Sequence, residues 1–187
     1  MGAVGWESFA RLAAAPVTVT VRGEVISVDM APFERVWFAP PDSWRIEDET
    51  GRLRWLANDE VFARWGPGGG EPAWSEPRRP GVWHSGDMTA TTLVRPRELL
   101  RPHNDDFTRP MGPVEQTEFL GRPAWQVLLA PPAHKPRPVR QILDVASGVT
   151  LAYRDPDGVS IAEFTAFETG VDLPAETFTM PLGGRVP

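Results

Sequence analysis

Turn-forming residues divide this chain into segments no longer than a β-strand. Among its 187 residues are 17 glycines and 21 prolines, a density that leaves little room for long helices. The clearest turn is Asp157-Gly158, which lies between two stretches of alternating apolar and polar residues, the pattern of a tight β-hairpin. We therefore expect many short strands joined by local turns in an antiparallel sheet.

Alternation of apolar and polar side chains locates the strands. Val17, Val19 and Val21 alternate with polar residues, as a strand with one buried face requires. Similar stretches continue to the turn at Asn58-Asp59, where a tight hairpin favours residues that tolerate a positive φ. The expected strands cover residues 17–28, 33–38, 44–47, 53–57, 61–65, 88–94, 114–120, 124–129, 139–145, 149–154 and 159–167.

Two short helices accompany these strands. Residues 5–15 place Trp6, Phe9 and Ala13 at helical spacing, and a proline ends the pattern. Residues 95–100 predict one or two helical turns, again ended by a proline.

Two long connections lack any apolar period. Residues 66–82 are rich in glycine and proline and predict a mobile loop, and residues 131–138 form a second connection rich in proline. The strands before residue 66 cannot cover both faces of a sheet alone, so the first loop is expected within one domain rather than between two. The prediction is a single domain over residues 1–187.

Charge and cysteine content exclude several classes of protein. The chain has 19 Lys and Arg against 25 Asp and Glu, a net charge of −6, which argues against binding to nucleic acid or to anionic lipid surfaces. It has no cysteine, so disulfides and thiolate metal sites are excluded. No apolar stretch is long enough to span a membrane, and no signal-peptide pattern is present. We expect a cytoplasmic protein, or an envelope protein if a leader precedes residue 1.

Residues capable of catalysis do not form a recognisable site. His84, His103 and His134 fall in loops without the spacing of metal ligands, and the run at residues 103–106 is typical of a solvated loop. No serine lies in a nucleophile-elbow motif, and the glycines at 68–70 lack the residues of a phosphate-binding loop. We therefore expect no catalytic residue, no metal, no cofactor and no enzymatic activity.

The eight tryptophans are the most informative residues for function. Those on expected strands occupy apolar positions, so they belong either to an ordinary core or to an apolar face left open to a ligand. Two more lie in or beside the loop rich in glycine and proline, where they could cover the sheet as a lid. The first group is Trp44, Trp55, Trp65 and Trp125, and the second is Trp74 and Trp83.

Spaced turn and packing residues give the chain a family resemblance. In the last third they are Gly121, Asp144, Gly148, Leu151, Asp157, Gly158, Phe167, Pro174, Phe178 and Pro181, and near the start they are Pro41, Trp44, Arg45, Ile46 and Glu47. In this order they resemble the LolA-like proteins, a family of lipoprotein carriers and their relatives, over most of the chain. The resemblance suggests an actinobacterial source.

The resemblance implies a fold and a function. The fold is α+β: a curved, open antiparallel half-barrel of about eleven strands, with two or three short helices in its concave face and an apolar cavity between them. The leading hypothesis is a non-catalytic carrier or sensor that binds a lipid or other apolar small molecule there. The alternative is a regulatory module with a self-filled cavity that binds a protein partner. The expected ligand-binding residues are Val21, Phe38, Trp44, Ile46, Trp55, Trp65, Leu99, Trp125, Leu128 and Leu143.

Overall fold

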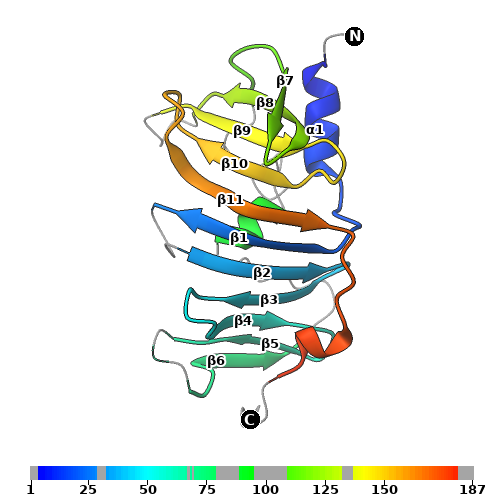
Figure 1. Cartoon of the computed structure of the whole chain (residues 1–187), viewed down its shortest axis with the longest axis vertical. Coiled ribbons are helices and arrows are strands. Elements are labelled where there is room, and N and C mark those ends of the chain that lie inside the picture. The colour runs from blue at the N-terminus through cyan, green and yellow to red at the C-terminus, as the bar shows by residue number, and fades with distance from the viewer. Residues whose placement is uncertain are drawn as a thin grey trace.

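One open antiparallel sheet organises the protein. The computed structural model describes residues 4–28, 33–66, 68, 70–78, 89–94, 109–131 and 137–180. Within them, eleven strands lie in the order β6-β5-β4-β3-β2-β1-β11-β10-β9-β8-β7. Figure 1 shows two meanders joined in the middle of the sheet by β1 and β11. The strands are β1 (Val21–Ser27), β2 (Phe33–Ala39), β3 (Ser43–Glu47), β4 (Leu53–Ala57), β5 (Val61–Arg64), β6 (Trp74–Pro77), β7 (Glu115–Phe119), β8 (Arg122–Leu129), β9 (Val139–Asp144), β10 (Thr150–Arg154) and β11 (Ser160–Thr169).

Local turns set the order of the strands, as the sequence predicts. Between β10 and β11, Gly158 has a φ of 88° and its N–H donates to the carbonyl of Asp155. Between β7 and β8, Leu120 and Gly121 have φ of 51° and 72°, the two positive values that a type I′ turn requires. The expected fold class is therefore confirmed: an open antiparallel sheet of eleven strands with short helices.

Helix α1 (Trp6–Ala14) forms where the spacing of apolar residues predicts it. Phe9 and Ala13, four residues apart, are buried, and Trp6 stacks on Phe9 with 5.7 Å between ring centroids. The helix ends at Ala14, two residues before Pro16. No helix within the described ranges is long and apolar enough to cross a membrane.

The strand expected at residues 88–94 is wrong, because this segment contains helix α2 (Thr89–Val94). Three threonines and a valine favour a strand by local propensity. In the structure, however, Ala90, Leu93 and Val94 are fully buried, and their spacing of three and four residues fits the buried side of a helix. Tertiary packing thus overrides local propensity in this short element.

Two details of the first meander also differ from expectation. The segment predicted as a mobile loop at residues 66–82 contains strand β6, paired with β5. At the β4–β5 turn no residue has a positive φ; the Asn58 side-chain oxygen instead accepts from the N–H groups of Glu60 and Val61. A side chain therefore closes this turn in place of a strained backbone. The helix expected at residues 95–100 lies outside the described residues.

The residues that the structure describes form two hydrophobic clusters on the sheet. The larger one joins both meanders with α1 and α2. The smaller one consists of Leu53, Leu56, Val61, Ala63 and Trp65, with Met180 packed against it. A 3₁₀ helix, η2 (Ala175–Phe178), lies against β3 and is held by bonds from Arg45 to the carbonyl of Thr177 and from Asn58 to that of Phe178.

Candidate functional site

Five expected ligand-binding residues lie together on one face of β1–β4. Val21 lies directly opposite Phe38, Phe38 opposite Trp44, and Ile46 opposite Trp55. Residues that face each other in an antiparallel pair project to the same side of the sheet. We call this group, Val21, Phe38, Trp44, Ile46 and Trp55, the aromatic face.

The aromatic face is packed as a core. Val21, Trp44 and Ile46 have no exposed surface, and Phe38 and Trp55 retain 1% and 2%. The rings of Phe38 and Trp44 lie 4.6 Å apart, and Trp55 meets Phe62 edge to face at 4.3 Å. A side chain that lines a cavity large enough for water keeps accessible surface, so in this structure these five residues fill their own space.

Helix α2 packs on the same side of the sheet as the aromatic face. It contacts β1, β2 and β10, and Leu93 belongs to the same cluster as the aromatic face. Glu34 of β2, directly opposite Val25 and 1% exposed, accepts hydrogen bonds from the N–H groups of Thr89 and Ala90 at 3.3 and 2.8 Å. The first N–H groups of a helix have no partner within it, and Glu34 supplies one.

Burial governs the charge of Glu34. Loss of water around the carboxylate raises its pKa, while the bonds from Ala90 and Thr89 and the charge of Arg54 oppose that rise. The net pKa lies above the ordinary value. The sequence gives a signal for this residue: Glu34, Val36 and Phe38 alternate along one strand, so Glu34 is expected on the inward side. Sequence reasoning nevertheless missed it, because it considered only apolar residues there.

The second half of the sheet contributes two expected residues. Trp125 of β8 lies directly opposite Leu143 of β9; Leu143 is fully buried and Trp125 is half-buried. A buried polar group lies beside them, in which Gln141 donates to the Thr150 hydroxyl at 2.8 Å and to the Tyr153 hydroxyl at 3.4 Å. Burial raises the pKa of Tyr153, so its hydroxyl stays protonated.

Two expected residues, Trp65 and Leu128, are not brought to this site. Trp65 belongs to the smaller cluster, and its indole donates to the carbonyl of Gly70 at 3.2 Å. Leu128 lies opposite Arg140 and three residues from Trp125, so it projects from the other side of β8. Leu99, like Trp83 of the expected lid, lies outside the described residues. Trp74 lies on edge strand β6, 41% exposed, with its ring edge against Phe62.

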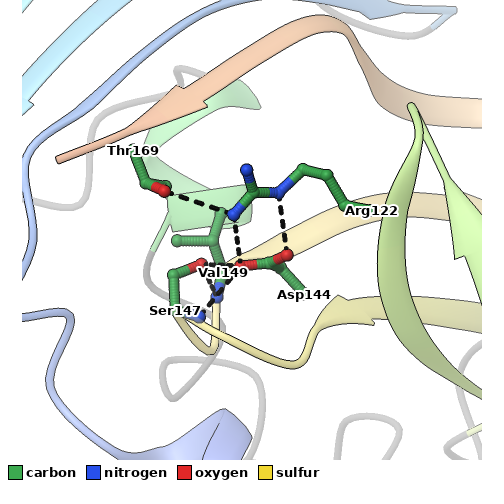
Figure 2. A network of polar contacts seen from close by, with 5 residues as sticks. All are labelled: Arg122, Asp144, Ser147, Val149 and Thr169. Atoms are coloured by element: carbon green, nitrogen blue, oxygen red, sulfur yellow. Dashed lines mark hydrogen bonds and ion pairs between the residues drawn. The ribbon is translucent and has the colours of Figure 1, made fainter. Parts of the chain in front are cut away.

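An ion pair between half-buried Arg122 and buried Asp144 holds the β8–β9 end of the sheet (Figure 2). Asp144, with no exposed surface, accepts two bonds from the Arg122 guanidinium at 2.9 and 3.2 Å and two from the N–H and hydroxyl of Ser147. Arg122 also donates to the Thr169 hydroxyl, which ties β8 to β11. Both carboxylate oxygens accept bonds from structural partners, and the two bonds from Ser147 close the turn that follows β9.

A pocket of about 420 Å³ opens beside the smaller cluster, away from the aromatic face. It combines a few apolar groups with an exposed carboxylate, an amide and a hydroxyl. Its lining residues are Asn58, Glu60, Val61, Pro77, Thr179 and Met180. Within the described part of the chain, no three histidine, aspartate or glutamate side chains are grouped so as to hold a metal ion. The histidines singled out from the sequence lie outside that part.

Comparison with solved structures places the fold. The chain is similar to a chain of the complex structure of Pseudomonas aeruginosa MucA/MucB, at 16% identity, with a TM-score of 0.54 over 95% of this chain and 61% of that one. It is also similar to MucB in complex with MucA(peri), at 14% identity, with a TM-score of 0.51 over 95% and 60%. This chain thus spans about three fifths of the length of these MucB-complex chains.

A weaker likeness involves a LolA superfamily protein from Nitrosomonas europaea, at 12% identity and a TM-score of 0.29 over 95% of this chain and 99% of that one. No family model and no curated protein sequence matches the chain. The organisms named by these neighbours lend no support to the expected actinobacterial source. The two MucA/MucB neighbours show the fold alone: this chain shares its fold with the matched three fifths of those chains.

Proposed function

We propose that this chain is a non-catalytic protein-interaction module whose aromatic face is filled by its own side chains. The observation that carries the proposal is the burial of Val21, Phe38, Trp44, Ile46 and Trp55, each 2% exposed or less. A lipid carrier needs apolar surface that a chain of CH₂ groups can replace. Here that surface is already covered, and the contact with α2 contributes to the same core.

The likeness to MucB adds support. Two structural neighbours of this chain are structures of MucA with MucB, so this fold occurs in a protein that forms a complex with another protein. Fold alone does not decide function, so the packing of the aromatic face carries the proposal and the likeness agrees with it.

Carriage of an apolar ligand is the second candidate, and one observation favours it. Among the described residues, the indole N–H of Trp55 and the hydroxyl of Thr89 are buried and have no hydrogen-bond partner. Buried polar groups without partners are uncommon in native proteins. A ligand with a polar group at one end of an apolar body would supply the missing acceptor if α2 moved aside.

Native mass spectrometry of the protein isolated from its source cells separates the two candidates. Under gentle conditions we expect an added mass of polypeptide size, and no uptake when fatty acid or phospholipid is then offered to the purified chain. A discrete added mass that extracts into organic solvent as lipid would contradict the interaction module and favour the carrier. Trp55→Phe, which removes the indole N–H but keeps an aromatic ring, is the matched variant: it should weaken retention only if a ligand bonds to Trp55.

A further inference from the structure

Strand β7 leaves one edge of the sheet open. It is the last strand of the sheet, and its backbone pairs with β8. Glu115, Gln116 and Glu118 are exposed, and Thr117 and Phe119 are half-buried. Among the described residues, no other segment forms a backbone bond with these five. Such an edge presents unpaired N–H and C=O groups to which a further strand can bond.

The β7–β8 turn determines which groups point outward. In a two-residue type I′ hairpin the flanking residues, here Phe119 and Arg122, exchange both backbone bonds. Bonded pairs then recur at every second residue, so the N–H and C=O groups of Gln116 and Glu118 point away from β8. Pro123, which has no N–H, lies opposite Glu118, as an unbonded pair allows.

The exposed edge carries negative charge. The Glu118 carboxylate has no hydrogen-bond or ion-pair partner among the residues that the structure describes. Glu115 accepts a bond from Gln126 at 2.8 Å and is exposed. Because they are three residues apart, the two carboxylates project to opposite faces of the strand. A strand added at this edge would meet a glutamate on each of its faces.

Charge decides between a second copy of this chain and a different partner. Two β7 edges placed together would gather four glutamates into one small patch, in a chain whose net charge is already −6. Charged edge residues discourage such pairing between copies. A lysine or arginine opposite each glutamate would instead add a favourable cross-strand pair.

We propose that the outer edge of β7 binds an extended, lysine- or arginine-bearing segment of a protein partner by strand addition. This inference rests on the proposed function, since it names the surface and the partner chemistry of the interaction module. Backbone bonds to Gln116 and Glu118 would supply the attachment, and the two glutamates would select a basic segment.

Titration of the ¹⁵N-labelled chain with two synthetic peptides of equal length tests the proposal. One repeats a lysine-lysine-threonine-threonine unit, which places lysines on both faces of an extended strand, and the other repeats glutamate-glutamate-threonine-threonine. The lysine peptide is expected to shift the backbone amide signals of Gln116 and Glu118 first, with an affinity that falls as salt is added. The glutamate peptide is expected to leave these signals unchanged.

Three variants sharpen the test. Glu118→Pro removes one outward N–H and leaves the β7–β8 bonds intact. It should lower the affinity for the lysine peptide by about tenfold. Glu118→Gln keeps the N–H and removes the charge, and it should weaken binding by about twofold to fivefold. Glu49→Gln, an exposed glutamate in the β3–β4 turn, removes the same charge elsewhere and should leave binding unchanged.

The outcomes distinguish a failure of the edge proposal from a failure of the proposed function. Shifts of equal size with both peptides, or full binding by a natively folded Glu118→Pro, would overturn the edge proposal. Shifts confined to the pocket beside Met180 would overturn it too, while leaving the interaction module in place. Lipid in the mass spectrum would instead count against the interaction module itself.

Discussion

At the scale of single residues, Gly23 shows how tightly the centre of the sheet is built. A Cβ added there would lie 2.5 Å from the carbonyl oxygen of Ala166 and 2.7 Å from two ring carbons of Phe164. The missing side chain of Gly23 therefore makes room for the Phe164 ring on the neighbouring strand β11.

Gly23→Ala is expected to lower the free energy of unfolding by about 1–3 kcal/mol, because a backbone oxygen and a buried ring must both move. Urea unfolding followed by tryptophan fluorescence measures the loss. Gly112→Ala is the control, since nothing lies within 4 Å of its added Cβ. Equal stability of the two variants would show that β1 and β11 can separate without cost.

Glu34 makes a prediction about pH. Burial raises its pKa above the ordinary 4.5, so the folded state holds the proton more tightly than the unfolded state. The resulting stabilisation is complete below pH 4.5 and is lost as the pH rises through the raised pKa. As the pH rises from 4.5 through the raised pKa, the wild type should therefore lose stability relative to Glu34→Gln. Urea unfolding of both proteins at several pH values tests this, and parallel curves would contradict it.

At the scale of elements, α2 depends on its contacts rather than on its sequence. A helix of six residues with three threonines is not stable alone. Its buried leucine, Leu93, and the carboxylate of Glu34 hold it on the sheet.

Leu93→Ala is expected to cost about 2–5 kcal/mol, because it empties a fully buried site. Thr92→Ala changes a half-buried neighbour on the same helix and should alter stability by less than about 0.5 kcal/mol. Thermal or urea unfolding compares the two. A small effect of Leu93→Ala would mean that α2 leaves the sheet at little cost, as the carrier candidate requires.

How far the sequence predicts these elements depends on whether local or distant residues decide them. The β10–β11 hairpin was predictable, because Asp157-Gly158 and the alternation beside it are local signals. Helix α2 and strand β6 were not, since α2 needs Glu34 from another strand and β6 needs β5 as a partner.

The same distinction applies to the site. Alternation correctly placed Phe38, Trp44 and Trp55 on one face. Trp65 continues the apolar alternation of β5. Arg64 lies opposite Trp55, however, so Trp65 projects from the other face of the sheet and packs in the smaller cluster. Whether the face would be open or filled could not be read from the sequence, because that depends on what packs over it.

At the scale of the whole molecule, the pairing of β1 with β11 joins the two halves of the open sheet. Its registered residues are separated by most of the chain, from Val21 opposite Thr169 to Ser27 opposite Ala162. The pairings within each meander are local by comparison, as Figure 1 shows by the smooth run of colour on either side of this junction.

We expect the local hairpins to form before the β1–β11 junction, because closing a long loop costs chain entropy before any contact repays it. Pulse-labelling hydrogen exchange during refolding should show protection of β3 and β4 amides ahead of the β11 amides that bond to β1. Simultaneous protection of all three strands would contradict this order and indicate a single cooperative step.

The β1–β11 junction also has a consequence for biosynthesis. Strand β1 leaves the ribosome long before β11, which begins only at Ser160. At 5–20 residues per second, one edge of β1 waits on the order of ten seconds for its partner. During that interval the nascent chain exposes Val21 and Val25, which the finished protein buries completely. We therefore expect the growing polypeptide to bind chaperones that shield apolar strands until β11 emerges.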